Sequence, residues 1–201
     1  LICIWALLLI NQLLMVAGYV YYVKVTKSPI KEVSRYPMVS ILVPAHNEAK
    51  VIVKTVESLL QLEYPQERYE IIVINDNSSD NSRELLEDML LKNPHRALKV
   101  LNTDSVTGGQ GKSNALNIGY KESSGEYIVV YDADNTPERE ALKYLVAEIE
   151  SDKKLGVVIG KFRTRNRDVN LLTRFINIET LSFQWMAQAG RWQLFNLCTI
   201  P

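Results

Sequence analysis

The sequence contains few cysteines and carries no formal net charge. Two of the 201 residues are cysteines, one near each end of the chain. This number and spacing exclude a disulfide framework and a cysteine-ligated zinc module, and they are typical of a protein that folds in a reducing compartment. Lys and Arg together number 23, as do Asp and Glu, so the formal net charge is zero. Without a basic field to attract phosphates, we expect no nucleic-acid partner.

The first 23 positions contain no charged residue and are almost entirely apolar. As an α-helix they would span about 34 Å, enough to cross a hydrocarbon core of about 30 Å. Lys24, Lys27, Lys31 and Arg35 follow, and basic flanks of this kind stay in the cytoplasm. We therefore predict a transmembrane helix at 1–23 that places the rest of the chain on the cytoplasmic side of the cell membrane. A cleaved signal peptide is the alternative, but the segment has neither a basic start nor a small-residue cleavage site.

After a proline-containing juxtamembrane linker at 24–38, strand-like and helix-like patterns alternate. Short apolar runs predict buried strands, and apolar residues at helical spacing predict the helices between them. The predicted strands are 39–43, 70–74, 98–101, 127–131 and 156–162, and the predicted helices are 51–62, 82–91, 112–121 and 137–150. This alternation predicts an α/β domain at 39–168, with a mostly parallel sheet and helices on both of its faces.

Polar clusters follow three of these strands, at 44–48, 75–80 and 132–134. In an open parallel sheet, ligands bind outside the carboxyl ends of the strands, so all three clusters are expected at one edge. Asp132 and Asp134 stand directly after a buried strand, where two carboxylates can converge on one hard cation such as Mg²⁺ or Mn²⁺. Alone, a D-x-D motif is weak; beside two other polar strand ends it indicates a metal or nucleotide site.

The other polar residues each have a functional and a structural interpretation. Asp76 can accept hydrogen bonds from a base or a ribose, or it can support the turn that follows it. Asn47 and Glu48 precede a helix whose first N–H groups favour anions, although Glu48 can also simply stabilise the helix start. We favour binding for Asp76 and leave the alternative open for Glu48.

Glycines at 108, 109 and 111 precede Lys112 and suggest a phosphate-binding loop. The Walker pattern fails because Val106 stands where its first glycine belongs, and the dinucleotide pattern fails at Asn114. What remains is a glycine-rich loop that delivers Lys112 to a helix start, where its ammonium group can reach a diphosphate or remain solvated.

Taken together, four ordered motifs resemble those of family 2 glycosyltransferases. The motifs are Pro44-Ala45-His46-Asn47-Glu48, Asn75-Asp76-Asn77-Ser78-Ser79-Asp80, Gly111-Lys112-Ser113-Asn114-Ala115-Leu116-Asn117 and Asp132-Ala133-Asp134. The chain is most similar to the membrane-embedded, processive branch: cellulose, hyaluronan, chitin and poly-N-acetylglucosamine synthases. The resemblance implies a Rossmann-like GT-A fold and a hexosyl- or N-acetylhexosaminyltransferase. It also implies a UDP-sugar donor, Mg²⁺ or Mn²⁺, inversion at the anomeric carbon, and a carbohydrate or lipid-linked acceptor.

The resemblance also implies roles for individual residues. It places Ala45, Asn47, Glu48 and Asp76 at the uridine and Lys112 at the diphosphate. Pro44, Asp132 and Ala133 are expected against the nucleotide sugar, and Asp132 and Asp134 are expected to hold the metal. Asn75 departs from the pattern, because many members have a second Asp there.

The general base of the family lies well beyond the metal motif, and no matching motif precedes Pro201. Because the chain starts at Leu1 rather than Met and stops within apolar sequence, we expect a fragment whose base lies beyond Pro201. Residues 169–201 are predicted to begin an acceptor-side region with an amphipathic helix at 169–195, lying on a membrane surface or packed on the sheet. The competing hypotheses are a nucleotidyltransferase-like enzyme and a non-catalytic, nucleotide-binding membrane module.

Overall fold

The computed structural model describes residues 2–27, 31–161 and 168–197. The chain divides into two compact units. One unit is formed by 31–156, and the other combines the two ends of the chain, 1–30 and 157–201.

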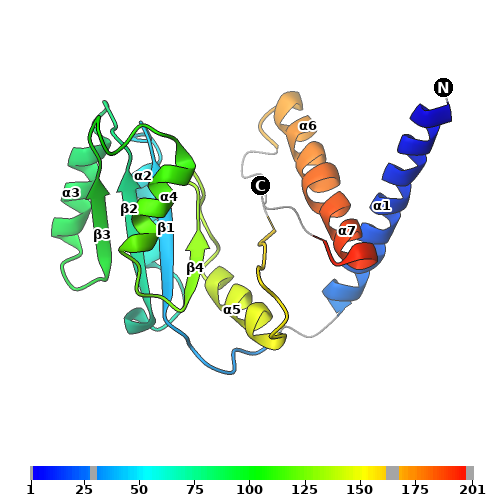
Figure 1. Cartoon of the computed structure of the whole chain (residues 1–201), viewed down its shortest axis with the longest axis horizontal. Coiled ribbons are helices and arrows are strands. Elements are labelled where there is room, and N and C mark those ends of the chain that lie inside the picture. The colour runs from blue at the N-terminus through cyan, green and yellow to red at the C-terminus, as the bar shows by residue number, and fades with distance from the viewer. Residues whose placement is uncertain (1, 28–30, 162–167, 198–201) are drawn as a thin grey trace. The chain divides into compact units, whose positions relative to one another are not determined.

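The unit at 31–156 is built on a parallel sheet of four described strands, in the order β3-β2-β1-β4 (Figure 1). The strands are β1 (Val39–Ala45), β2 (Tyr69–Asn75), β3 (Leu98–Asn102) and β4 (Tyr127–Val130). In the register, Ile41 lies between Ile71 on β2 and Val129 on β4. Since all four strands run the same way, their carboxyl ends share one edge of the sheet. The first four predicted strands are therefore present. The predicted burial is wrong for β4, where Ile128 and Val130 are exposed because this strand lies at the edge of the sheet.

Helices cover both faces of this sheet, as the sequence predicts. They are α2 (Ile52–Leu60), α3 (Ser82–Lys92), α4 (Lys112–Lys121) and α5 (Ala141–Ser151), with a short 3₁₀ turn, η1, at Gln66–Arg68. Leu59 of α2, Leu86 of α3 and Leu142 of α5 are fully buried in the larger core, with one face of the sheet. Ala115 of α4 packs on the opposite face. The core thus fixes the strand ends, and the polar residues that follow them, on a rigid frame.

The fifth predicted strand, 156–162, is wrong over its described part. Residues 156–161 form no strand, and Phe162 lies outside the described residues. Val157 is 41% exposed. A strand is stabilised by its ladder of hydrogen bonds to a neighbour, so apolar, β-branched sequence alone does not make one. The fourth helix also begins later than predicted, at Ala141 instead of Pro137.

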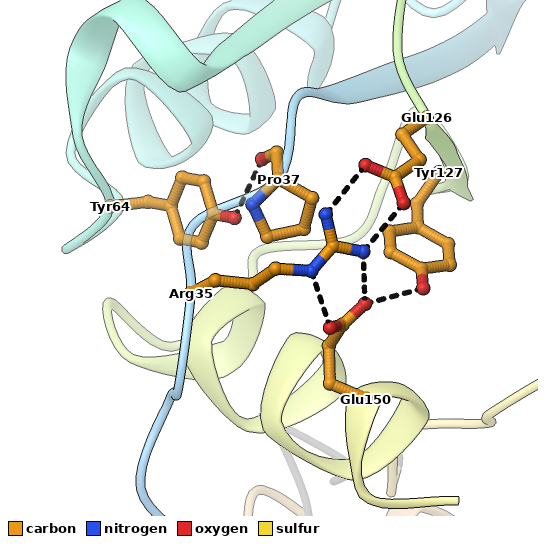
Figure 2. A network of polar contacts seen from close by, with 6 residues as sticks. All are labelled: Arg35, Pro37, Tyr64, Glu126, Tyr127 and Glu150. Atoms are coloured by element: carbon orange, nitrogen blue, oxygen red, sulfur yellow. Dashed lines mark hydrogen bonds and ion pairs between the residues drawn. The ribbon is translucent and has the colours of Figure 1, made fainter. Parts of the chain in front are cut away.

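Residues 31–38, in the predicted linker, are held on the amino-terminal side of the sheet by a network around Arg35 (Figure 2). Its guanidinium group donates hydrogen bonds to Glu150, at 2.6 and 2.8 Å, and to Glu126, at 2.5 and 2.9 Å. The hydroxyl of Tyr127 donates to Glu150, and that of Tyr64 donates to the Pro37 carbonyl at 2.8 Å. Arg35 lowers the pKa of both carboxyl groups. The chain entering β1 is thereby joined to the start of β4 and the end of α5.

The second unit contains α1 (Ile2–Lys27), α6 (Leu171–Glu179), a π-helical turn, η2 (Thr180–Met186), and α7 (Ala187–Phe195). Within α1, Cys3–Val25 has a mean hydropathy of 1.9 and is almost wholly unburied. It is the one helix of the described ranges that is long and apolar enough to cross a membrane. The helix continues past Val23 to Lys27, because lysine is a good helix former.

Glycines let α1 and α7 approach closely. A Cβ added at Gly18 would lie 2.0 Å from the Met186 carbonyl oxygen, and one at Gly190 would lie 2.0 Å from that of Leu14. Small residues allow this backbone approach between packed helices. The predicted helix at 169–195 is confirmed from Leu171 to Phe195, where α6, η2 and α7 follow one another without a break. Its last part, α7, packs against α1.

Candidate functional site

A cavity of about 470 Å³ lies at the carboxyl edge of the sheet. It is bordered by the segments that follow β1, β2 and β4 and by the start of α4. Its lining residues are Pro44, Ala45, His46, Glu48, Asp76, Gly109, Gly111, Lys112, Ala115, Asp132, Ala133 and Asp134. Seven of the eight residues predicted to bind a nucleotide sugar, and both predicted metal ligands, are in this set. Sequence segments up to 90 residues apart are thus brought together by the parallel sheet.

Asp132 and Asp134 enter the cavity from the turn after β4. This turn is anchored to α2, because the buried Thr55 hydroxyl donates a 2.7 Å hydrogen bond to the Ala133 carbonyl. The preceding Tyr131 is partly buried against the larger core, and desolvation raises the pKa of its phenol to about 12, so it stays neutral. Tyr131 and Ala133 thus hold the chain on both sides of Asp132.

Lys112 comes from the opposite wall. Gly111, with a φ of +92°, precedes it and ends the glycine-rich loop. The Lys112 ammonium group lies 2.6 Å from Asp132 Oδ1, and both side chains are about half exposed. An exposed ion pair of this kind contributes little to the free energy of folding. Lys112 and Asp132 can therefore separate and bind a ligand with little loss of stability.

Asp76 lies deeper in the site and is 5% exposed. Its backbone N–H donates to the Ala45 carbonyl at 2.8 Å, and its own carbonyl contacts His46 Nδ1 at 2.6 Å. Its carboxylate oxygen Oδ1 accepts from the Thr103 hydroxyl and from the Gly109 N–H, each at 2.9 Å. The Asp76 carboxylate therefore joins the end of β2 to Thr103 and to the glycine-rich loop, and it makes no bond to the turn at 77–79 that the sequence left possible.

Asn47 lies outside the residues that line the cavity. It adopts a left-handed conformation, with a φ of +56°. Its side-chain oxygen accepts hydrogen bonds from Ser79 N at 2.8 Å, Ser79 Oγ at 3.2 Å and Asp80 N at 3.3 Å. The Asp80 carboxylate in turn accepts hydrogen bonds from the Ser82 hydroxyl and from Ala49 N. The bond from Ser82 is the main cause that lowers the pKa of Asp80. Asn47 therefore joins the loops after β1 and β2 and shapes the site indirectly.

Thr103 was not picked out from the sequence, whereas His46 and Gly109 belong to the quoted motif and loop but were given no role of their own. The signal for Thr103 was its position, one residue after the end of β3, which is another carboxyl end at the same edge. Asn75, the departure from the family pattern, donates from its amide to Asn102 Oδ1 at 2.8 Å. Its side chain bonds the end of β3 and is not among those that line the cavity.

The carboxylates that line the cavity suit a divalent cation that also binds the phosphate oxygens of a ligand. No group of three or more His, Cys, Asp and Glu side chains with metal-binding spacing occurs in the described part of the chain. Mg²⁺ commonly takes only one or two carboxylates and completes its shell with phosphate oxygens and water. Asp132 and Asp134, lining one cavity with Lys112, fit that coordination.

The family model described as "Glycosyl transferase family 2" matches residues 40–199. The chain belongs to this family. The match covers the sheet unit from residue 40 and the region of α6 and α7, and it decides against the nucleotidyltransferase-like alternative.

Two named relatives are similar along most of the chain. A probable glycosyltransferase, YdaM, of Bacillus subtilis is 47% identical over 201 residues, covering 98% of this chain and 47% of the relative. A poly-β-1,6-N-acetyl-D-glucosamine synthase of Staphylococcus epidermidis is 34% identical over 174 residues, covering 83% of this chain and 40% of the relative. The chain thus spans less than half the length of these relatives.

Among solved structures, the mannosyltransferase PcManGT of Pyrobaculum calidifontis is similar, with a TM-score of 0.61 and 26% identity. The similarity covers 76% of this chain and 44% of the mannosyltransferase, which was solved with GDP-Man and Mn²⁺. Together with the parallel sheet, this confirms the predicted GT-A-like fold.

Proposed function

We propose that this chain binds a UDP-sugar together with Mg²⁺ or Mn²⁺ in the cavity at the carboxyl edge of the sheet. The enzyme transfers the sugar, with inversion, to a carbohydrate or lipid-linked acceptor at the cytoplasmic face of the cell membrane. The observation that carries this proposal is the convergence of Asp76, Lys112, Asp132 and Asp134 on one cavity. The named relatives and the Mn²⁺-bound neighbour support it.

Each side chain has a distinct role in donor binding. Asp76 accepts a hydrogen bond from the uracil ring, while Pro44 and Ala45 form the wall behind the nucleoside. Glu48 borders the same pocket and is available to the ribose hydroxyls. These roles follow from position: buried acceptors select a base, and backbone at a strand end packs against it.

The other half of the donor is a diphosphate. Lys112 leaves Asp132 to pair with a phosphate oxygen, and Asp132 and Asp134 hold the cation. When bound, the cation stabilises the negative charge that develops on the leaving diphosphate. N-acetylglucosamine is the first sugar to test, because one relative is named as a poly-N-acetylglucosamine synthase.

Transfer also requires a base within hydrogen-bond reach of the acceptor hydroxyl. Four acids line the cavity. Asp76 already accepts two hydrogen bonds, Asp132 is paired with Lys112, and in this proposal Glu48 faces the ribose and Asp134 holds the cation. We infer that the base comes from sequence beyond Pro201, so these 201 residues bind donor without transferring sugar. A missing base costs roughly 10²–10⁴-fold in rate. Sugar transfer by this chain at a rate typical of an enzyme would contradict that part of the proposal. It would also make Glu179, the one acidic residue between Leu171 and Phe195, a candidate base.

The binding test is calorimetry of the 201-residue chain in detergent, titrated with UDP in the presence and absence of Mn²⁺. We expect UDP binding that depends on Mn²⁺ and that Asp134→Asn abolishes. Asp88→Asn is the matched control, since Asp88 lies on α3 in an exposed pair with Lys92. Metal-dependent affinity that Asp134→Asn leaves unchanged would refute the metal assignment.

A further inference from the structure

The carboxylate of Asp76 is held from one side only. Both of its hydrogen bonds within the described residues, from the Thr103 hydroxyl and the Gly109 N–H, reach the same oxygen, Oδ1. The second oxygen, Oδ2, receives none from the described part of the chain. Because Asp76 lines the cavity and two donors fix Oδ1, Oδ2 is the acceptor that remains for a ligand.

Thr103 is placed firmly enough to orient its neighbour. Its backbone N–H donates to the Asn75 carbonyl at 3.1 Å, which extends the pairing of β3 with β2 by one residue. A β-branched side chain on such a fixed backbone has few rotamers to choose from. The hydroxyl is therefore a fixed donor, carried by the sheet.

The glycine-rich loop supplies the second donor through a close backbone approach. A Cβ added at the buried Gly108 would lie 1.9 Å from Thr103 Oγ1 and 2.5 Å from Asp76 Oδ1. Gly109 has a φ of +71°, a conformation that other residues rarely adopt. Only glycine at 108 lets the loop lie directly on the Thr103–Asp76 pair.

The loop is closed by its own hydrogen bonds. The Asp104 carboxylate accepts from Val106 N at 2.9 Å and from Thr107 N and Oγ1 at 2.8 Å, which lowers the pKa of this carboxyl. Gly108 N donates to the Asp104 carbonyl at 2.8 Å. These bonds fix the loop that carries Gly109, so the second donor to Asp76 is held in place as firmly as the first.

We propose that Thr103 is a positioning residue for the nucleotide base, which orients Asp76 so that Oδ2 accepts the ring N–H of uracil. This inference rests on the proposed function. Uracil presents a donor at N3, whereas cytosine has an acceptor at N3 and a donor only on its exocyclic amine. A fixed carboxylate meets the uracil donor, while a carboxylate released from Thr103 can turn towards the cytosine amine. Thr103 thereby sets the preference for UDP over CDP.

The experiment measures the dissociation constants of UDP and CDP, with Mn²⁺, for the 201-residue chain in detergent. Loss of a hydrogen bond to a charged group predicts that Thr103→Val weakens UDP binding about 10-fold. CDP binding is expected to change less, so the CDP-to-UDP ratio of dissociation constants falls towards one. Thr103→Ser keeps the hydroxyl and should restore the wild-type ratio. Thr180→Val, which removes an exposed hydroxyl from the helical unit, should leave the ratio unchanged.

The outcomes separate this inference from the proposed function. If the unmodified chain binds no UDP, the proposed function fails, and the inference with it. If it binds UDP and Thr103→Val keeps both the affinity and the ratio, only the inference is overturned. A Thr103→Val chain that binds both nucleotides more weakly by the same factor also overturns it, because a purely structural role predicts that result. Circular dichroism confirms that each variant is folded, and Gly108→Ala, which must displace the loop, provides a second variant that should lower the ratio.

Discussion

Glu70 provides the sharpest test of how the sheet unit is stabilised. It lies on β2, is 3% exposed, and is charged. One oxygen accepts from Ser40 Oγ at 2.6 Å, Ser124 N at 2.7 Å and Ser124 Oγ at 2.8 Å, and the other lies 2.8 Å from Lys99 Nζ. These contacts join β1, β2, β3 and the turn before β4. The perturbation is Glu70→Gln, which keeps the shape and removes the charge.

The pKa of Glu70 gives the magnitude. Burial alone would raise the pKa, but the contacts with Lys99, Ser40 and Ser124 outweigh it and lower the pKa from 4.5 to about 2. That difference corresponds to about 3 kcal/mol of folding free energy. Because the pKa is lower in the folded state, this stability is fully present above the unfolded pKa of about 4.5. It is lost as the pH falls through that value towards about 2.

Hydrogen exchange measured by mass spectrometry on peptides from β1 and β2 reports this unit separately from the helical one. At pH 7 we expect Glu70→Gln to reduce the opening free energy of these peptides by about 3 kcal/mol. The difference from the unmodified protein should shrink as the pH is lowered from 5 to 3, after correction for intrinsic exchange. Glu67→Gln, on the exposed turn η1, is the control and should have no effect. Equal protection of the Glu70→Gln and unmodified chains at pH 7, or a difference that does not change with pH, would refute the reasoning.

Three further predictions concern the site, the helical unit and topology. Lys112→Ala should weaken UDP binding by roughly 10- to 100-fold in calorimetry, since a charge-assisted contact with the diphosphate is lost. Mn²⁺ alone should bind at least as tightly, because Lys112 no longer competes for Asp132; weaker binding of both ligands would contradict this role. Gly190→Ala should increase hydrogen exchange in α7, because its Cβ would meet the Leu14 carbonyl, whereas at Gly156 the added Cβ meets nothing within 4 Å. In right-side-out vesicles, residues after the apolar helix should resist external protease, because basic flanks stay in the cytoplasm; digestion from outside would overturn the orientation.

The sequence predicted the elements whose signal is local. A run such as Ile71–Ile74 is buried on both faces, so its continuous apolar character identified the strand directly. Parallel strands end at one edge, so the placement of Asp76 and Asp132 in a single cavity followed from the order of elements. The sequence did not show which segments would lie beside one another and form hydrogen bonds. The run from Val157 has strand character but no neighbour to pair with among the described residues.

The same limit applied within the site. Asn47 matches a family motif and is predicted at the uridine, but its left-handed backbone and its bonds to the loop at 78–80 are visible only in the structure. Thr103 belongs to no quoted motif, and its role depends on a contact with Asp76 across 27 positions of sequence. Contacts of this kind arise from tertiary packing, which a pattern along one segment does not encode.

The two ends of the sheet differ in how far their charges are satisfied, and this difference separates scaffold from site. At the amino-terminal side, the half-exposed Arg35 is paired with two carboxylates beside a cavity of about 570 Å³, and the buried Glu70 has four polar contacts, so these charges are satisfied within the protein. At the carboxyl edge, Asp134 makes no hydrogen bond or ion pair to another residue of the described ranges. Asp132 has one exposed partner, and one oxygen of Asp76 receives no hydrogen bond from the described residues. Unsatisfied charge is costly to hold together in a folded protein, because like charges repel and buried acceptors need donors. In the proposed function, a cation and a nucleoside diphosphate supply what this edge lacks, so this cavity is where that proposal places the gain in binding free energy.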